Sequence, residues 1–438
     1  MGVSMQKQKY YLIKELRMKI LVVGGGGREH AIVKKMSESM SSPELYALPG
    51  NGGMAKIAKC FSAVKATDIS GILKIVKREG FDLVFVASDD PLALGLVDEL
   101  ENIGVRAFGP TKCAAKIEWS KVFSKALMKK YSIPTAAYEA FDNFEAAENY
   151  AKSGIKYPIY IKTDGLALGK GAVRAENQEQ ALEILKYMMC DKAFGDSGNS
   201  VVIEEELIGQ EITVLAFCDG RTVRPMVASQ DHKRALDGDK GENTGGMGAF
   251  SPSRIYTQEI AAYCMENIYL PTVAAMRKEG RKFKGVLYFG LILTADGVKV
   301  IEYNARFGDP EAQVVLPRLK TDLLEIVNAV IDEKLDEIDI EWEDNAAVCV
   351  ILASGGYPGA YKTGYEISGA EELEQITGFT AYHAGTILED GKFKTAGGRV
   401  LGVTATAENL DEAIKKVYSQ IGKISFKDMF YRKDIGLK

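Results

Sequence analysis

The stretch EYNARFGDPE at 302–311 holds the sharpest cluster of residues that could do chemistry. Glu302 and Asn304 alternate along a predicted strand, so both side chains lie on one face of it. A carboxylate and an amide oxygen on one face suit Mg²⁺ when nucleotide phosphates and water complete its coordination. If the strand persists, Arg306 continues that face, and its guanidinium can hold a carboxylate or phosphate through two hydrogen bonds. This pattern favours a metal–nucleotide site over a charged strand end with a turn at Gly308–Pro310.

A glycine-rich loop, GLALGKG at 165–171, is a second candidate site, and Lys162 precedes it. Its glycines leave backbone N–H groups free to face phosphate oxygens, and Lys170 adds positive charge. The loop is not a P-loop, because GxxxxGK[ST] is absent and a strand follows where a helix would be needed. These residues alone support phosphate binding and a mobile hairpin tip about equally.

The glycine turn GGGGREH at 24–30 lies where a predicted strand passes into a predicted helix. Backbone N–H groups at a helix N-terminus attract anions. A dinucleotide site would also need an acidic residue after the second strand, and no clear candidate stands there. The turn therefore favours a phosphorylated small molecule over NAD, although an NAD-dependent oxidoreductase stays open on this motif alone.

The segment DHKRALDGDKGENTGGMG at 231–248 joins seven charged residues to a run with three glycines in five positions. A solvated surface loop explains the charges but not the glycines. A loop that orders around a ligand explains both, since bare backbone can approach a substrate and the charges can meet amine and carboxylate groups. We therefore expect this segment to form part of a substrate site.

The hydrophobic pattern indicates the elements that position these motifs. Alternating strands and helices over 18–118 predict a parallel α/β domain. Strand pairs predict an antiparallel, β-rich α+β region, and they lie at 157–175, 201–220 and 284–311. An acidic connection at 332–344 marks a boundary before a third unit, whose last helix is expected around Leu410–Ile421.

The composition excludes several classes of protein. The chain has 438 residues, and its net charge of −5 disfavours a general nucleic-acid binder. The apolar run after Lys19 is too short for a signal peptide, and no stretch approaches the length of a membrane span. Six scattered cysteines and only three histidines indicate a reducing compartment without a zinc cluster. We expect a cytoplasmic protein that binds neither nucleic acid nor membrane.

Taken together, the motifs closely resemble the phosphoribosylamine–glycine ligase family of the ATP-grasp superfamily, which acts in purine biosynthesis. The resemblance covers Met18 to the C-terminus, and its most specific motifs are RFGDPEAQ (306–313) and SQDHKRALDGDKGENTGGMGAFSP (229–252). The other motifs follow in the family's order: GGREH, KTDGLALGKG, VIEEELIGQE, HAGT (383–386), GGRVL (397–401) and YRKDIG (431–436). The resemblance implies an N-terminal α/β substrate domain at 18–118, an ATP-grasp domain at 119–335 with a lid at about 137–204, and a C-terminal α/β domain at 336–438.

The resemblance also implies roles for single residues. Lys121 and Lys162 would contact phosphates, Glu204 to Leu207 would hold adenine, and Glu211 would hold the ribose. The ATP-binding set is Lys121, Lys162, Gly165, Gly169, Lys170, Gly171, Glu204, Glu205, Leu207 and Glu211. The substrate-binding set is Gly26, Gly27, Arg28, Glu29, Asp89, Gly245, Gly246, Gly308, Asp309 and Pro310. Glu302 and Asn304 match the metal ligands, and the expected catalytic residues are Arg306, Asp231 and Lys233.

The implied reaction joins glycine to 5-phosphoribosylamine with ATP and Mg²⁺ or Mn²⁺, through glycyl phosphate, in a monomer or weak homodimer. One departure is SDDPL at 88–92, where Asp89 replaces a Glu of the family. The alternatives are another ATP-grasp carboxylate–amine ligase and a non-catalytic nucleotide-binding protein. The 231–248 and 306–313 motifs argue against the first alternative, and the intact Lys162, Glu302 and Asn304 argue against the second.

Overall fold

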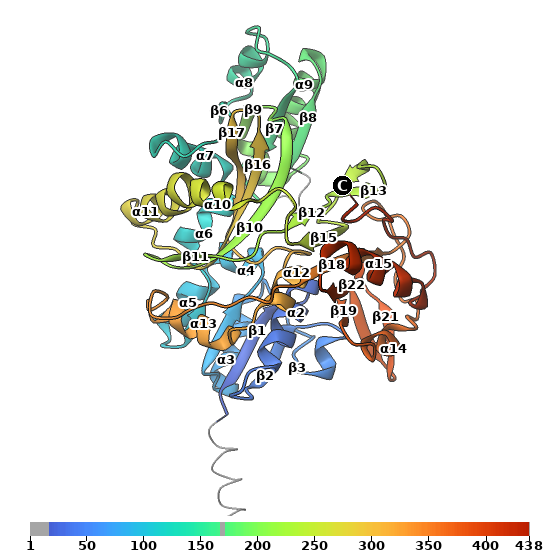
Figure 1. Ribbon diagram of the computed structural model, residues 1–438. Helices are drawn as coiled ribbons and strands as arrows, with labels where there is room; N and C mark the ends of the chain where they lie inside the picture. Colours follow the sequence, from blue (N-terminus) through green and yellow to red (C-terminus); the bar gives the residue numbers. More distant parts are fainter. Residues whose placement is uncertain (1–16, 167–170, 438) are drawn as a thin grey trace, which may run out of the picture.

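The computed structural model describes residues 17–166 and 171–437, and Figure 1 shows the N-terminal sheet below, two antiparallel sheets above and the C-terminal sheet to one side. The N-terminal sheet is parallel, in the order β3-β2-β1-β4-β5. Its strands are β1 (Lys19–Gly24), β2 (Glu44–Pro49), β3 (Lys59–Cys60), β4 (Leu83–Val86) and β5 (Arg106–Phe108). Its helices are α2 (Gly27–Ser37), α3 (Ile69–Glu79), α4 (Asp89–Leu94), α5 (Leu96–Asn102) and α6 (Lys112–Trp119). The run from Ile20 to Val23 is fully buried, as in a strand covered on both faces, which confirms the predicted α/β domain.

The first antiparallel sheet follows helix α7 (Lys121–Lys130) and has the order β6-β9-β7-β8. Its strands are β6 (Tyr138–Phe141), β7 (Ile159–Thr163), β8 (Ala172–Ala175) and β9 (Val201–Glu205), with helices α8 (Phe144–Ala151) and α9 (Gln178–Leu185). The pairing of β7 with β8 confirms the predicted strand, loop and strand at 157–175. A hydrophobic core of its own, which includes Ile161 and Leu185, fills this sheet and its helices. Gly169 and Lys170 lie outside the described residues.

The second antiparallel sheet has the order β11-β10-β16-β17. Its strands are β10 (Gly209–Asp219), β11 (Val223–Pro225), β16 (Lys284–Thr294) and β17 (Gly297–Asn304), and nearby helices are α10 (Gln258–Cys264), α11 (Leu270–Lys278), α12 (Ala312–Val315) and α13 (Leu323–Ile331). Only residues 206–208 separate β9 from β10, so the chain crosses directly from the first antiparallel sheet to the second. A register shift in the pairing of β16 with β17 places Glu302 opposite Gly290.

The C-terminal sheet has the order β12-β15-β18-β22-β19, and its strands pair antiparallel. Its strands are β12 (Gln230–Asp231), β15 (Gly248–Ser251), β18 (Ala346–Ala353), β19 (Phe379–His383) and β22 (Arg399–Ala407). Helices α14 (Ala370–Glu374) and α15 (Leu410–Gln420) accompany it, and β20 (Thr386–Glu389) pairs with β21 (Lys392–Thr395). The helix predicted near Leu410 is confirmed. The sheet takes β12 and β15 from the 229–252 motif, which hydrophobic periodicity did not indicate.

Helices α2 and α15 have 11 residues each, and α10 continues through a π-helical turn, Met265–Tyr269, into α11. No helix in the described part of the chain is long and apolar enough to cross a membrane.

Candidate nucleotide and substrate site

Two lysines share one carboxylate in the first antiparallel sheet. Lys162 on β7 is ion-paired with Glu204 on β9, and the Nζ atom of Lys125 on α7 lies 2.6 Å from Glu204 Oε2. All three side chains are buried. Burial alone would lower the pKa of Lys162, but the carboxylates of Glu204 and Glu302 raise it, so Lys162 stays a cation. The side chain of Glu204 serves these lysines, so the expected adenine contact would have to come from its backbone.

Lys121 lies at the start of the glycine loop. Its Nζ atom donates to the Gly165 carbonyl at 3.2 Å, and burial lowers its pKa although Glu302 acts in the opposite direction. The Gly171 carbonyl accepts from the Thr163 backbone N–H at 2.9 Å, which closes the base of the loop. The structure therefore brings Lys121, Lys162 and the two ends of the loop together.

The expected metal ligands Glu302 and Asn304 lie at the end of β17. Burial would raise the pKa of the half-buried Glu302, but Lys233, Lys162, Lys121 and Arg306 together hold it below its ordinary value. Glu302 is therefore ionised, with four cations around one carboxylate. Three of these cations also have a second carboxylate partner: Lys162 pairs with Glu204, Lys233 with Glu211 and Arg306 with Glu118.

The Arg306 side chain contacts Asn304 although strand β17 ends before Arg306. The sequence placed Arg306 on the same strand face, but β17 ends at Asn304. The Nη2 atom of Arg306 nevertheless donates to Asn304 Oδ1 at 3.0 Å and lies 2.9 Å from Glu118 Oε1. Its Nε atom is buried and has no hydrogen-bond partner among the described residues, so it is a donor that a ligand could use.

Lys233 connects the expected ribose contact to the metal ligands. Its Nζ atom lies 3.4 Å from Glu211 and 3.9 Å from Glu302, and Glu211 contributes most to raising its pKa. Burial raises the pKa of the neighbouring Asp231 to about 7. Of the other expected nucleotide residues, Glu205 accepts from the Ala137 backbone N–H at 3.0 Å, and Leu207 lies half-buried in the connection between the two antiparallel sheets.

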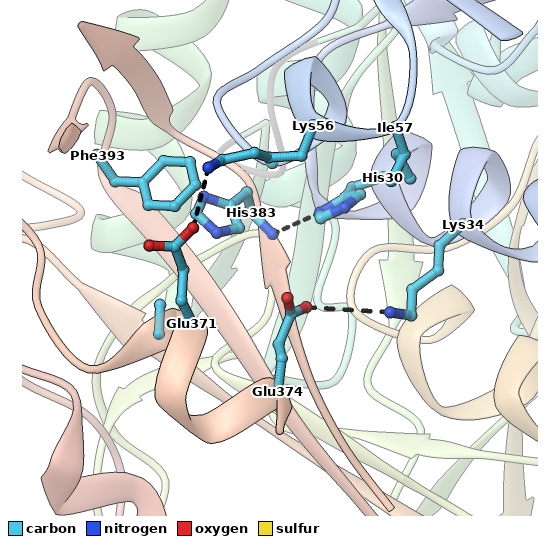
Figure 2. Close-up of a pocket in the computed structure, with 10 residues that line it drawn as sticks. His30, Lys34, Lys56, Ile57, Glu371, Glu374, His383 and Phe393 are labelled. Atoms are coloured by element: carbon cyan, nitrogen blue, oxygen red, sulfur yellow. Dashed lines mark hydrogen bonds and ion pairs between the residues drawn. The ribbon is translucent and has the colours of Figure 1, made fainter. Parts of the chain in front are cut away.

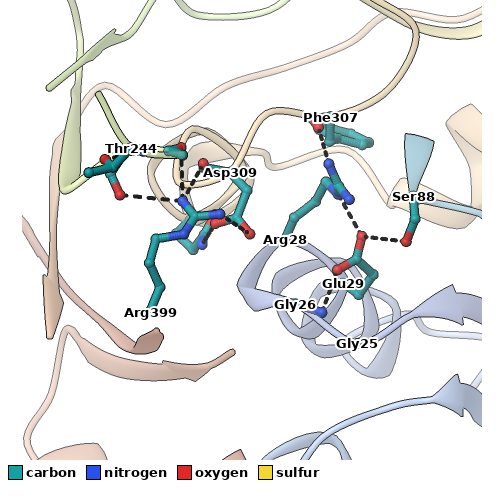
Figure 3. Close-up of polar contacts among 12 residues, drawn as sticks. Gly25, Gly26, Arg28, Glu29, Ser88, Thr244, Phe307, Asp309 and Arg399 are labelled. Atoms are coloured by element: carbon teal, nitrogen blue, oxygen red, sulfur yellow. Dashed lines mark hydrogen bonds and ion pairs between the residues drawn. The ribbon is translucent and has the colours of Figure 1, made fainter. Parts of the chain in front are cut away.

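The glycine turn at the start of α2 is partly filled by the protein's own carboxylates (Figure 3). Glu29 Oε2 accepts from the Gly26 backbone N–H at 2.6 Å, and the Asp309 carboxylate faces the Gly26–Gly27 turn. The Arg28 guanidinium donates to Glu29 at 2.6 Å and to the Phe307 carbonyl at 3.1 Å. Where we expected free N–H groups for a bound anion, the structure places Glu29 and Asp309.

Asp89 faces the same charged group. Burial would raise the pKa of Asp89, but the guanidinium groups of Arg306 and Arg28 keep it below its ordinary value. The residue that departs from the family pattern is therefore an ionised carboxylate that both arginines stabilise.

The remaining expected substrate residues meet around an arginine of the C-terminal sheet. Arg399 donates to the carbonyl oxygens of Gly245, Gly246 and Asp309 at 2.9, 3.3 and 2.7 Å. Gly246 has φ of +117°, and a Cβ atom on it would lie 2.5 Å from Pro310 Cδ. The TGG run therefore lies flat against the 308–310 turn, which accounts for its lack of side chains.

The charged half of the 231–248 segment contacts the C-terminal end of the chain. It forms a hairpin of β13 (Arg234–Leu236) and β14 (Lys240–Asn243) where we expected a loop ordered by a ligand. Asp237 accepts from the Lys433 backbone N–H at 2.8 Å, and Asp239 lies 2.9 Å from Arg432. Part of the charge therefore serves intramolecular pairing with the YRKDIG motif.

A cavity of about 70 Å³ lies where α2 meets α14 and the end of β19 (Figure 2). The His383 backbone N–H donates to His30 Nδ1 at 2.8 Å across this contact. Burial lowers the pKa of His383 to about 4 and also lowers that of His30, so both rings are neutral near pH 7. Two ion pairs flank the cavity: Lys56–Glu371 at 3.0 Å and Lys34–Glu374 at 4.0 Å. The GGREH and HAGT motifs therefore meet in a contact between the N- and C-terminal regions.

Sequence reasoning missed three charged residues of this site, Glu118, Lys125 and Arg399. Lys125 follows Lys121 by four residues on one helix, so the same helix face could have indicated it. Arg399 belongs to the GGRVL motif, but the motif alone gave it no partner. Glu118 carried no signal, because its partner Arg306 lies far away in the sequence.

Comparison with known proteins matches this chain to three family models in series. They are phosphoribosylglycinamide synthetase N domain at 18–118, ATP-grasp (A) domain at 119–312 and C domain at 347–438. A phosphoribosylamine–glycine ligase of Caldanaerobacter subterraneus is 47% identical over 95% of this chain and 99% of its own. The trifunctional purine biosynthetic protein adenosine-3 of Gallus gallus is 45% identical, over 96% of this chain and 42% of its own.

Solved structures give the same match. The crystal structure of a phosphoribosylamine–glycine ligase from Thermotoga maritima superposes with a TM-score of 0.84 at 31% identity, over 95% of this chain and all of that one. A biotin carboxylase from Campylobacter jejuni superposes with a TM-score of 0.73 at 14% identity, over 96% of this chain and 94% of that one, and shares the fold alone.

Proposed function

The chain belongs to the phosphoribosylglycinamide synthetase family, and from this premise we propose that it activates glycine as glycyl phosphate before phosphoribosylamine attacks. Its activity is that of an ATP-dependent phosphoribosylamine–glycine ligase of purine biosynthesis. The order of steps, the metal, the residue roles and the domain limits 18–118, 119–335 and 336–438 belong to the proposal.

The observation that carries the proposal is the group of four cations whose charges all lower the pKa of Glu302, with Lys233 Nζ 3.9 Å from its carboxylate. Lys121 and Lys162 come from helix α7 and strand β7, and Lys233 and Arg306 come from the 231–248 segment and the residues after β17. Cations gathered in this way suit the phosphates of ATP, with the adenine near the 206–208 connection. ATP would then lie between the two antiparallel sheets.

Glu302 and Asn304 fit a divalent metal, since they offer a carboxylate and an amide oxygen on one strand face. No group of three or more His, Cys, Asp or Glu that could hold a metal occurs among the described residues, so nucleotide oxygens would supply the other ligands. When bound, Mg²⁺ or Mn²⁺ would neutralise phosphate charge during transfer.

The residues of this chain then have separate roles. Arg306 would hold the glycine carboxylate through its unpaired Nε donor, next to the terminal phosphate of ATP. Transfer forms a bond from a glycine oxygen to phosphorus and releases ADP. The amine of phosphoribosylamine attacks the acyl carbon, and phosphate departs with that glycine oxygen. Asp231, with its pKa raised by burial to about 7, suits the acceptance of the amine proton.

Glycine labelled with ¹⁸O in its carboxylate tests the order of steps. One label is expected in the released phosphate for each turnover, and the other is expected in the amide product. A control without phosphoribosylamine establishes the background exchange. Unlabelled phosphate with normal product would show that ATP activates another group.

A further inference from the structure

Arg399 is the point at which the C-terminal sheet contacts the expected substrate residues. It is the first residue of β22, at a register shift in the pairing of β18 with β22. One nitrogen, Nη1, lies within hydrogen-bond distance of three carbonyl oxygens, and Nη2 lies 3.2 Å from Asp309 Oδ2. Figure 3 shows this guanidinium directed at Asp309, with Thr244 beside it.

These contacts hold two loops against each other. The Gly245–Gly246 turn lies on one side of the guanidinium, and the Asp309–Pro310 turn lies on the other. Gly246 fits against Pro310 so closely that any side chain there would collide with the proline ring. Removal of the guanidinium would leave three carbonyl oxygens and a carboxylate without their shared donor, which favours separation of the turns.

Asp309 extends this arrangement to the N-terminal region. Its Oδ1 atom accepts from Gln313 Nε2 at 2.7 Å, and the carboxylate faces the start of α2. Burial would raise the pKa of Asp309, but Arg399 and Arg28 keep it below its ordinary value. Arg399 and Gln313 therefore bind one carboxylate oxygen each and together hold Asp309 toward the Gly26–Gly27 turn.

The guanidinium supplies two donor nitrogens at a fixed separation. Nη1 contacts the three carbonyl oxygens of both turns, while Nη2 lies 3.2 Å from Asp309 Oδ2. A lysine would keep the charge, but its single nitrogen would have to serve the carbonyl oxygens and the Asp309 carboxylate together. If Arg399 acted through its charge alone, Arg399→Lys would keep normal kinetics.

We infer that Arg399 is a positioning residue for the phosphoribosylamine subsite, through which the C-terminal sheet holds the 244–246 and 308–310 turns in register. The inference rests on the proposed function and assigns phosphoribosylamine to these turns of the expected substrate-binding set, with ATP and glycine bound nearer to Glu302 and Arg306. Arg399 contacts no expected nucleotide residue among its hydrogen-bond and ion-pair partners in the described chain.

Steady-state kinetics of Arg399→Ala and Arg399→Lys test the inference, with each of the three substrates varied in turn. We expect Arg399→Ala to lower kcat/KM for phosphoribosylamine about 100-fold, the scale of loss that small misplacements cause. The KM values for ATP and glycine are expected to change less than about 3-fold, because their contacts stay in place. Arg399→Lys is expected to recover only a minor part of the loss.

Arg254→Met is the matched control. Arg254 also joins the central region to the C-terminal region, through an exposed ion pair of 2.7 Å with Asp411, but it lies away from the two turns. We expect near-normal kinetics in this variant. Thermal unfolding of every variant distinguishes local misplacement of the turns from loss of the fold. If Arg399→Ala does not fold, the kinetics of Arg399→Lys serve as the test.

The possible outcomes distinguish a failure of the role given to Arg399 from a failure of the proposed ligase function. An unchanged kcat/KM for phosphoribosylamine in both Arg399 variants, or a rise of comparable size in the KM for ATP, would overturn the role of Arg399 and leave the ligase activity standing. Wild-type ATP turnover that did not depend on phosphoribosylamine would contradict the proposed function itself. Full activity of Arg399→Lys would show that charge alone suffices, and positioning would be rejected.

Discussion

Arg306 and Glu118 form a largely buried ion pair, with 2.9 Å between Nη2 and Oε1, that ties the end of β17 to helix α6. Glu118 also accepts from the Ala305 backbone N–H at 2.8 Å. Glu118→Gln keeps the shape but leaves Arg306 with less opposite charge, so we expect a loss of about 3 kcal/mol in the free energy of unfolding by urea. The exposed pair Lys152–Glu148 supplies a control, since Glu148→Gln is expected to change stability little. Equal effects in the two variants would contradict the structural importance of Glu118.

Lys125 and Lys162 both pair with Glu204. We expect Lys125→Met to weaken ATP binding, although Lys125 itself is not expected to contact ATP. Once Lys125 is gone, Glu204 attracts Lys162 more strongly and withdraws it from the phosphates. Calorimetry should show roughly 10-fold weaker binding of ADP with Mg²⁺, about 1.4 kcal/mol. Lys129→Met is matched, because Lys129 lies one turn further on α7, exposed and also over the Tyr138 ring. Equal affinity in both variants would remove this role from Lys125.

Glu302→Gln tests the metal site. It keeps the hydrogen-bonding shape but removes the charge at the centre of four cations, so kcat is expected to fall about 100-fold or more. The melting temperature is expected to fall modestly, because the ionised carboxylate that these cations stabilise is lost. The measurement is the initial rate against Mg²⁺ and Mn²⁺ concentration. A near-normal rate at ordinary Mg²⁺ would refute the assignment.

Gly246→Ala tests the close contact with Pro310, and Gly238→Ala is its matched control. Both glycines have positive φ, +117° and +70°, but a Cβ atom on Gly238 would meet nothing nearer than 4.0 Å. Gly238→Ala is expected to cost about 1 kcal/mol from backbone strain alone. Gly246→Ala adds a collision with the proline ring, so it should cost more and also lower kcat/KM. Urea unfolding and kinetics of both variants measure the difference.

Asp231 makes stability depend on pH. Burial raises its folded-state pKa from 3.8 to about 7, so the folded state holds this proton more tightly than the unfolded state does. The wild type therefore loses stability from Asp231 as pH rises from about 4 to 7, and the penalty is complete above pH 7. Asp231→Asn should raise the melting temperature at pH 8 more than at pH 5, while activity falls. The exposed Asp196→Asn variant is the control, and a pH-independent difference in Asp231→Asn would contradict the assignment.

The strands of this fold could be predicted from the sequence, because buried runs such as Ile20–Val23 and the strand pair ending at Asn304 carry their own periodicity. The position of Glu302 and Asn304 on one strand face could also be predicted, since they are two residues apart on one strand. Local spacing fixes which face a side chain occupies, and this suffices for pairs within one element.

The partners of charged residues could not be predicted in the same way. Packing of separate elements brings Arg399 to Asp309 and Glu118 to Arg306. The sequence around one residue of such a pair does not indicate which residue its partner is. The Glu29 carboxylate at the start of α2 shows the same limit. Its spacing from Gly26 is local, but a glycine turn can receive a ligand or a protein carboxylate with equal ease.

The sharing of strands in the C-terminal sheet affects how this chain can be divided. Ser251 of β15 pairs with Ala347 of β18, so the sheet is assembled from stretches made at different times during synthesis. While the ribosome is still translating the intervening helices, β15 has no neighbour on that side. A gene fragment that starts at residue 347 would produce β18 with a bare edge, open to pairing with other chains. Transferring the C-terminal region to another protein as a module would therefore require residues 229–252 to be included.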